Sequence, residues 1–263
     1  MKIVRTVAEV RAGLPDAGIG LVPTMGALHA GHVALLEAAR AECEFVVASI
    51  FVNPTQFAPG EDYAAYPRDE ESDARTAAAA GVDLLFVPAL EEMYPEGFQT
   101  WVDVENLSHT LEGEFRPGHF RGVATICLKL FNAVRPARAY FGQKDAHQVA
   151  IVKRLVLDLN LGVEIRVVPT VRDPDGLAVS SRNAYLSPAE RERALALPRA
   201  LAAGAAAYRE GRDAVAAARA AMDGLEVEYL EEAVEFDDRP LLVAAVRVGR
   251  TRLIDNVSLE GDA

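Results

Sequence analysis

Two histidines, His29 and His32, have the clearest chemical potential in the chain, and they lie three positions apart in the segment P-T-M-G-A-L-H-A-G-H over 23–32. At this spacing both imidazoles share one face of the first turn of a helix. A helix N-terminus also favours an anion, because it offers free backbone N–H groups and the positive end of the helix dipole. Gly31, between the histidines, lets a ligand approach the backbone closely. The segment therefore predicts a site for a polyphosphate.

The flanking segments decide between this interpretation and a simpler one, in which the histidines only cap a helix or lie in solvent. An apolar run over 19–22 precedes the segment and predicts a strand, and a helical pattern over 33–40 follows it. A strand before the motif and a helix after it are the context that an H-x-G-H nucleotidyl-transfer motif requires. This context favours the phosphate site.

A second cluster, F-G-Q-K-D over 141–145, stands at the end of a predicted strand and opens a predicted helix over 146–159. Gly142 permits close approach of the backbone, and Lys144 brings a positive charge to a phosphate. Asp145 can cap the helix or bind a ribose hydroxyl. Taken alone, the cluster is equally a glycine turn with a solvated lysine. A second strand-to-helix junction at the same sheet edge favours a ligand site.

A third cluster lies in a turn-rich segment over 171–183, where Ser180, Ser181 and Arg182 form a compact set of hydrogen-bond donors. Such a loop can close over a triphosphate and add positive charge where the α-phosphate develops negative charge. By itself the segment is also compatible with a polar loop between two domains.

Short apolar runs that alternate with helical patterns must position these clusters. The strands are expected over 19–22, 45–52, 82–87, 139–141 and 163–168, and the helices over 33–40, 69–80, 123–134 and 146–159. This alternation predicts an α/β fold: a Rossmann-like parallel sheet with helices on both faces. Ligands of such folds bind beyond the carboxyl ends of the strands. We expect one crevice there to collect residues that follow strands, namely His29, Asn53, Gly142 and Arg172.

The last third of the chain predicts a smaller α+β domain, so that we expect one domain over 1–170 and a second over 171–263. Ser187 and Glu190 form a capping box around Pro188, which marks a helix start. Alanine-rich helices are expected over 191–208 and 213–222, and strands over 227–232, 241–248 and 252–254.

The composition excludes several classes of function. The chain has 263 residues and a formal net charge of −12, which argues against a nucleic-acid-binding protein because that function needs a basic face. Its two cysteines, Cys43 and Cys127, form no metal-binding motif and fit a reducing cytoplasm. There is no signal-peptide pattern, and no apolar stretch reaches the roughly 20 residues of a membrane span. We therefore expect a cytoplasmic protein with no nucleic-acid partner, no membrane partner and no metal site of its own.

Seven blocks of the sequence, in this order, strongly resemble the pantothenate synthetase (pantoate–β-alanine ligase) family, and the resemblance runs from about Thr6 to Asn256. The blocks are P-T-M-G-A-L-H-A-G-H (23–32), F-V-N-P-T-Q-F (51–57), Y-P-R (66–68), R-P-G-H-F-R-G-V (116–123), F-G-Q-K-D (141–145), S-S-R-N (180–183) and T-R-L-I-D-N (251–256). Together they are far more specific than H-x-G-H alone.

The resemblance implies an ATP-dependent ligase that condenses D-pantoate with β-alanine to pantothenate. The carboxylate of pantoate would attack the α-phosphate of ATP to give pantoyl adenylate and pyrophosphate, and the amine of β-alanine would then displace AMP. The resemblance also implies a homodimer. We expect Mg²⁺ to arrive bound to ATP.

The resemblance also implies the residues of the site. Adenylation requires in-line positioning and neutralised phosphate charge, and we expect the donors for this catalytic role to be His29, His32, Lys144 and Arg182. Pantoate would contact Gln56 and Gln148, with Gln56 also assigned to β-alanine, and Asn53 joins them as a substrate-binding residue. The ATP site would comprise Met25, Gly26, Ala27, Leu28, His29, Ala30, Gly31, His32, Gly142, Gln143, Lys144, Asp145, Val171, Val179, Ser180, Ser181 and Arg182.

The family assigns His32 as a proton donor, but the chemistry favours a different role. Neither attack by a carboxylate nor departure of pyrophosphate requires a proton from the enzyme, and a helix N-terminus disfavours a protonated imidazole. We therefore expect His32 to donate a hydrogen bond to the triphosphate. Arg116 and Arg121 remain open between substrate binding and support of a subunit contact, and Asp73 is a weak candidate ligand for magnesium.

The chain departs from the family pattern in two places. Val179 stands where the family usually has methionine, which should loosen the adenine wall, and the connection over 232–241 is shorter than usual. Two other functions stay open at this point: another H-x-G-H adenylyltransferase of coenzyme biosynthesis, which would leave AMP on its product, and an ATP-binding regulator with a degenerate site.

Overall fold

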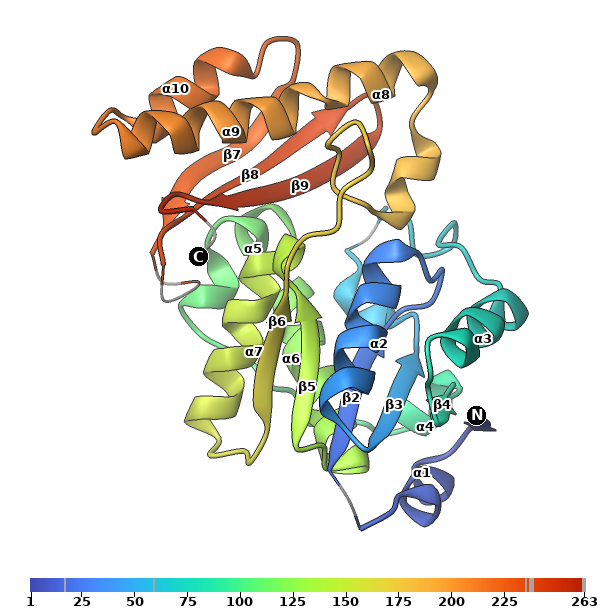
Figure 1. The fold of residues 1–263 in the computed structure, drawn as a ribbon. Coiled ribbons are helices and arrows are strands. Elements are labelled where there is room, and N and C mark those ends of the chain that lie inside the picture. The colour runs from blue at the N-terminus through green and yellow to red at the C-terminus, as the bar shows by residue number, and fades with distance from the viewer. Residues whose placement is uncertain (17, 59, 235, 237–238, 262–263) are drawn as a thin grey trace. The chain divides into compact units, whose positions relative to one another are not determined.

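The computed structural model describes residues 1–263 except 17, 59, 235, 237–238 and 262–263 (Figure 1). The described chain divides into two compact units. The first unit comprises 1–142 and 151–168, and the second comprises 143–150 and 169–263. Positions 235 and 237–238 belong to the connection over 232–241 that we expected to be short, so this part of the expectation lies outside the described residues.

In the described part of the first unit, parallel strands form one six-stranded sheet in the order β1-β4-β3-β2-β5-β6. The strands are β1 (Lys2–Val4), β2 (Ile19–Thr24), β3 (Phe45–Ile50), β4 (Leu84–Phe86), β5 (Arg138–Gly142) and β6 (Glu164–Val168). The predicted strands are present, and β1 is an addition that the sequence analysis did not foresee. Only Val4 of β1 is buried, so its three residues carry too short an apolar run to predict a strand.

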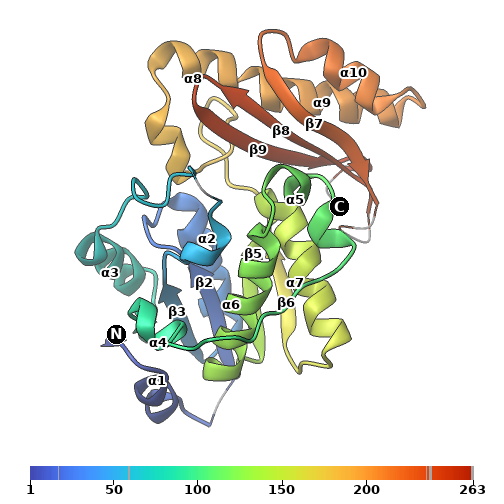
Figure 2. The same cartoon turned by 180° about the vertical axis from the view of Figure 1, so that it is seen from behind.

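Helices cover both faces of this sheet, as predicted. Helix α2 packs on β2, β3 and β5 from one face, whereas α1 and α6 contact each other on the opposite face. Figure 1 shows α2 in front of the sheet, and Figure 2, seen from behind, shows α6 in front. The helices are α1 (Val7–Gly13), α2 (Ala30–Glu42), α3 (Glu70–Ala79), α4 (Leu90–Met93), α5 (Glu112–Phe115), α6 (His119–Val134) and α7 (Ala146–Asp158), which spans parts of both units.

The order of the strands creates a switch point between β2 and β5. From β2 the chain continues to β3 and β4 on one side, and it later adds β5 and β6 on the other side. In open parallel sheets, ligands bind outside the carboxyl ends of the strands at such a point. His29 follows β2, Asn53 follows β3 and Gly142 is the last residue of β5. These three residues therefore lie at the carboxyl ends of neighbouring central strands.

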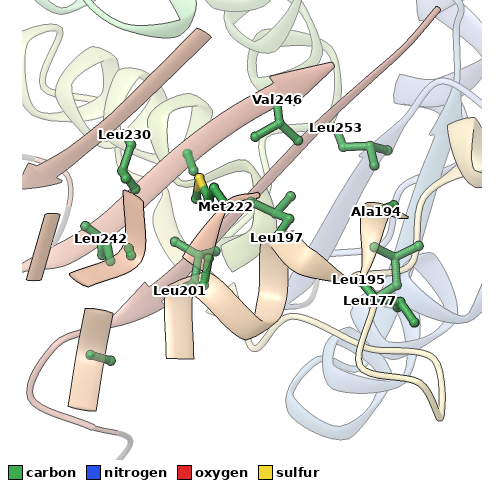
Figure 3. Close-up of a cluster of buried hydrophobic side chains, with 14 of the residues drawn as sticks. Leu177, Ala194, Leu195, Leu197, Leu201, Met222, Leu230, Leu242, Val246 and Leu253 are labelled. Carbon is green, nitrogen blue, oxygen red and sulfur yellow. The ribbon is translucent and has the colours of Figure 1, made fainter. Parts of the chain in front are cut away.

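In the described part of the second unit, three antiparallel strands form a sheet in the order β7-β8-β9, and α8, α9 and α10 pack against it (Figure 1). Figure 3 shows its core, where Leu197 and Leu201 of α9 meet Leu230, Leu242 and Val246 of the sheet. Burial of these apolar side chains stabilises the unit. The elements are α8 (Pro188–Ala194), α9 (Ala196–Arg209), α10 (Ala214–Ala221), β7 (Glu226–Ala233), β8 (Leu241–Val248) and β9 (Thr251–Ser258).

The single helix expected over 191–208 is wrong, because the chain forms α8 and α9 with Leu195 between them. Pro198 explains the break: proline has no N–H to donate to the carbonyl of Ala194, and its ring clashes with that carbonyl. The expected capping box is confirmed, because Ser187 Oγ accepts the backbone N–H of Glu190 and the Glu190 carboxylate accepts that of Ser187. The last strand is longer than predicted.

Across the described residues, we find no helix with the length and apolar composition needed to cross a membrane.

Candidate active site

The two histidines of the H-x-G-H motif are tied to the first turn of α2. His29 is the N-cap residue, and its Nδ1 atom accepts the backbone N–H of Gly31 at 3.2 Å. The Nδ1 atom of His32 accepts the backbone N–H of His29 at 3.3 Å, and the two ring centroids lie 4.1 Å apart. The pair therefore caps the helix, which is the simpler interpretation weighed above, and does so in one fixed geometry.

This geometry decides which nitrogen of each histidine can donate. A neutral imidazole that accepts through Nδ1 carries its proton on Nε2. The donor nitrogen of both His29 and His32 is therefore Nε2, and both rings lie at the N-terminus of a helix, where the backbone dipole favours negative charge. This arrangement suits a hydrogen bond to an anion.

The turn between β2 and α2 has an unusual backbone conformation. Gly26 and Ala27 have φ angles of 84° and 51°, and the first of these is readily adopted only by glycine. Thr24 Oγ1 accepts the N–H of Gly26 at 3.1 Å and donates to the carbonyl of Ser49 at 2.7 Å. The threonine thus ties the start of the turn to strand β3.

The carboxylate of Asp73, from helix α3, holds the second half of the turn. Its two oxygens accept the backbone N–H groups of Ala27 at 2.9 Å and Leu28 at 2.7 Å. Asp73 is only 4% exposed. Asp73 therefore has a structural role in the turn, and its role as a magnesium ligand stays a prediction. Within the described residues, no group of three or more histidine, cysteine or acidic side chains is arranged to hold a metal ion.

Met25 lies where the turn meets two further parts of the first unit. It lines a cavity of about 240 Å³ together with Phe51, which directly follows β3, and Arg68 of the Y-P-R block. Its Sδ atom also lies 3.1 Å from Nε2 of Gln56.

Asn53 and Gln56 form a buried pair of amides after β3. Asn53 Nδ2 donates to Gln56 Oε1 at 3.1 Å and to the carbonyl of Gly122 at 3.2 Å. Asn53 is 1% exposed and Gln56 is 8% exposed. The first unit therefore brings Met25, Asn53 and Gln56 together. Two neutral amide groups lie close to the turn between β2 and α2.

Two residues of the R-P-G-H-F-R-G-V block, Arg116 and His119, contact the backbone carbonyl of Gln56. The Nη2 atom of Arg116 donates to the backbone carbonyl of Gln56 at 3.2 Å, and Nδ1 of His119 lies 2.8 Å from the same oxygen. Arg116 also forms ion pairs with Glu61 at 2.7 Å and Glu112 at 3.3 Å. Arg116 is thus a buried support for Gln56.

Arg121, the second arginine left open by the sequence, has a different environment. Its guanidinium lies over the ring of Trp101 at 4.9 Å. The contacts of Arg116 and His119 with Gln56 could not be predicted from the sequence, because they join residues about sixty positions apart.

Apart from Gly142, which ends β5 in the first unit, the remaining predicted residues lie in two segments of the second unit. The 3-10 turn Gln143–Asp145 carries Lys144, whose Nζ lies 3.2 Å from Asp145 Oδ1, and Gln148 is half-buried in the first turns of α7. In the other segment, Val179 N–H donates to the carbonyl of Val171 at 2.9 Å. Ser180 then caps the 3-10 turn Ser181–Tyr185, its Oγ accepting the N–H of Arg182 at 3.3 Å.

The family model and the curated relatives that match this chain belong to the same family. Residues 2–258 match the family model described as pantoate-beta-alanine ligase. The pantothenate synthetase of Moorella thermoacetica is 50% identical over 280 residues, which cover 99% of each chain.

Solved structures agree with this. The crystal structure of pantothenate synthetase from Thermus thermophilus superposes with a TM-score of 0.95 at 50% identity, covering 98% of this chain and 99% of the other. A pantoate-beta-alanine ligase from Francisella tularensis, solved in complex with beta-gamma ATP and beta-alanine, gives a TM-score of 0.86 at 35% identity and covers 100% of this chain and 99% of the other.

Proposed function

This chain belongs to the pantoate–β-alanine ligase family, and from that premise we propose that it makes pantothenate from D-pantoate, β-alanine and ATP. The carboxylate of pantoate attacks the α-phosphorus of ATP, so that pantoyl adenylate forms and pyrophosphate leaves. The amine of β-alanine then attacks the acyl carbon and displaces AMP, with loss of a proton from the nitrogen. Adenylation of this kind depends on in-line positioning and on neutralisation of phosphate charge.

The observation that carries the proposal is the hydrogen bonding of the two histidines at the N-terminus of α2. Both imidazoles accept a backbone N–H through Nδ1, so the donor nitrogen of each ring is Nε2. We assign these donors to the phosphates of ATP. His32 then acts as a hydrogen-bond donor that stabilises charge, and no proton leaves it during adenylation.

We assign Gln56 and Asn53 to pantoate, and Gln56 also to β-alanine. Their amides match the hydroxyls and carboxylate of pantoate without a second strong cation beside the nucleophile. A cation there would stabilise the carboxylate in the ground state and slow its attack. Gln148 joins them by the family resemblance.

We assign the remaining nucleotide contacts to segments of the second unit and to Gly142. Lys144 and Arg182 bring positive charge to the phosphates, which is the chemistry that a triphosphate requires. Main-chain and hydroxyl groups complete the proposed ATP contacts, together with the turn before α2. The proposed set is Met25, Gly26, Ala27, Leu28, Ala30, Gly31, Gly142, Gln143, Asp145, Val171, Val179, Ser180 and Ser181.

We propose that Mg²⁺ is carried by the phosphates of ATP. The buried carboxylate that holds the turn, Asp73, already accepts two backbone N–H groups through its two oxygens. Phosphate oxygens and water are the ligands that Mg²⁺ prefers in nucleotide sites. The ion would then supply charge neutralisation at the triphosphate.

Three further proposals concern the domains, the oligomeric state, which the family implies, and the location. The domain over 1–170 binds nucleotide and pantoate, and the domain over 171–263 acts as a lid. The protein works as a homodimer, which light scattering at micromolar concentration tests. It acts in the cytoplasm, a reducing compartment that fits its two buried free cysteines, Cys43 and Cys127.

The direct test is incubation with ATP, Mg²⁺, D-pantoate and β-alanine, followed by mass spectrometry of the products. We expect pantothenate and free AMP in equal amounts, both dependent on β-alanine. An adenylyltransferase of the same superfamily would instead leave AMP attached to its product. A nucleotide-binding regulator would give neither product.

A further inference from the structure

Two buried polar residues near the end of β9, Asp255 and Asn256, are not used by the proposed reaction. They close the T-R-L-I-D-N block, and they are 2% and 4% exposed. Buried carboxylates and amides require hydrogen-bond partners, so their partners identify what they hold in place. Both residues reach segments of the second unit that we have assigned to the nucleotide.

Asn256 binds the turn that carries Lys144. Its Nδ2 group donates to the backbone carbonyls of Gln143 at 2.8 Å and Lys144 at 3.0 Å. Its Oδ1 atom accepts from Nε2 of Gln143 at 3.4 Å. An amide has two N–H donors, and here they are directed to two consecutive carbonyls. The side chain of Asn256 thereby fixes the backbone at Gln143 and Lys144.

Asp255 binds the base of the loop that carries Ser180 and Arg182. Its carboxylate accepts a bidentate pair of hydrogen bonds from Arg172, at 2.6 Å from Nη1 and 3.0 Å from Nη2. Such paired bonds fix the orientation of both groups. Arg172 forms an isolated β-bridge with Ala178, directly before the loop.

One strand end therefore connects both segments. Asp255 Oδ1 accepts the backbone N–H of Asn256 at 2.8 Å, and Arg172 Nη2 donates to the carbonyl of Asn256 at 3.4 Å. The two side chains lie on consecutive residues of a strand that is paired with β8 along its whole length. A rigid strand is a better support than a loop for groups that must be held within a fraction of an ångström.

We infer that Asp255 and Asn256 are positioning residues of the adenylation step: they hold the main chain that carries Lys144 and Arg182 in one fixed relation. The inference rests on the proposed function, which assigns those two cations to ATP. A positioning residue acts through the cation it holds. Its loss should lower the rate of adenylate formation much more than it weakens the binding of pantoate, because two of the three residues assigned to pantoate, Asn53 and Gln56, belong to the first unit.

A double-mutant cycle between Asn256 and Lys144 tests this. The rate measured is pantoate-dependent exchange of labelled pyrophosphate into ATP, without β-alanine. We expect Asn256→Ala to lower the maximal exchange rate about 10²-fold in the wild-type background, with a change of at most about twofold in the KM for pantoate. In the Lys144→Ala background the same change should cost at most about twofold, because the group that Asn256 positions is already gone.

The matched control is Leu253→Ala, a large-to-small change in the core at the same strand. It should lower the midpoint of thermal unfolding at least as much as Asn256→Ala while leaving the exchange rate at 25 °C near that of the wild type. If Asn256→Ala does not fold, the cycle is run with Asn256→Asp, which keeps the size of the side chain and removes both donated bonds. A second cycle pairs Asp255→Asn with Arg182→Ala.

Equal fold losses in both backgrounds would overturn the inference, and so would an Asn256 variant with a wild-type exchange rate. A loss in Leu253→Ala as large as that in Asn256→Ala would also overturn it, since stability alone would then explain the effect. A wild-type protein without pantoate-dependent exchange would instead refute the proposed function, which keeps the two failures distinct.

Discussion

The Nδ1 atom of His119 lies 2.8 Å from the backbone oxygen of Gln56, so the first residue of helix α6 fixes the main chain of a proposed substrate-binding residue. Its Nε2 atom lies 3.2 Å from Nη1 of Arg116, which can only donate. His119 therefore accepts through Nε2 and donates through Nδ1. Burial, reinforced by the charge of Arg116, lowers the pKa of His119 to about 4 from 6.5.

The first prediction concerns acid stability. Between pH 6.5 and about 4 the unfolded state binds a proton at His119 that the folded state does not, so stability falls as the pH falls through this window. The full effect of this one group is on the order of 3 kcal/mol. Urea unfolding at a series of pH values measures it.

The control for this prediction is His119→Asn, which keeps an amide donor near the position of Nδ1 and removes the titration. We expect the free energy of unfolding of this variant to depend less steeply on pH between about 4 and 6.5. Identical pH slopes in the variant and the wild type would show that His119 is not held neutral.

The second prediction concerns the close contact of α6 with the Asn53–Gln56 segment. A Cβ atom added at Gly122 would lie 2.5 Å from the carbonyl oxygen of Thr55 and 2.8 Å from the backbone nitrogen of Gln56. Gly122→Ala should therefore displace this segment, destabilise the protein by about 1–3 kcal/mol and raise the KM for pantoate about tenfold. Gly162→Ala, where an added Cβ meets nothing within 4 Å, is the matched control.

Steady-state kinetics and thermal unfolding of both glycine variants decide this point. A Gly122→Ala enzyme with an unchanged KM for pantoate would show that the segment does not bind that substrate.

The third prediction concerns Asp73. Asp73→Asn leaves one oxygen to accept an N–H and turns an NH₂ group toward the other, so that Ala27 or Leu28 loses its acceptor. We expect the KM for ATP to rise about tenfold, while the Mg²⁺ concentration that gives half of the maximal rate stays the same. A shift in that Mg²⁺ concentration would instead identify Asp73 as a metal ligand.

Asp69→Asn provides the comparison for Asp73, because it is a nearby carboxylate whose role as N-cap of α3 an asparagine can take over. This variant should keep the wild-type KM for ATP.

The fourth prediction separates two roles for His32. A glutamine side chain can place an amide N–H near the position of Nε2, whereas asparagine reaches only to the position of Nδ1. If His32 donates a hydrogen bond, His32→Asn should lower adenylate formation by about 10²–10³-fold, and His32→Gln should lower it about tenfold or less. Exchange kinetics over a range of pH values measure both. Equal and complete losses in the two variants would favour a proton-transfer role.

Much of the architecture is predictable from the sequence, because the strands of a buried parallel sheet are short continuous apolar runs such as 45–50. What escapes prediction depends on contacts between distant residues. Nothing near Asp73 in the sequence indicates that its carboxylate holds the turn at Leu28, 45 positions away. The break at Leu195 is different, because Pro198 is a local signal for it. The prediction of one helix gave more weight to the alanine-rich composition around that proline.

The candidate site also has features that the sequence predicts and features that depend on contacts between distant residues. Side-chain chemistry and spacing identify His29, His32 and Lys144 as candidate phosphate ligands. The sequence does not reveal that both imidazoles accept through Nδ1, because that depends on the fold of the turn before α2. The role of Asn256 is hidden for the same reason, since its partners lie more than 110 positions away.

One exchange experiment tests most directly whether the carboxylate of bound D-pantoate attacks the α-phosphorus of ATP on this protein. Wild-type enzyme is incubated with ATP, Mg²⁺, labelled pyrophosphate and D-pantoate, with β-alanine withheld. We expect label to enter ATP only when pantoate is present, and free AMP to accumulate only after β-alanine is added. Exchange without pantoate, or no exchange with it while pantothenate still forms, would contradict the pantoyl-adenylate route.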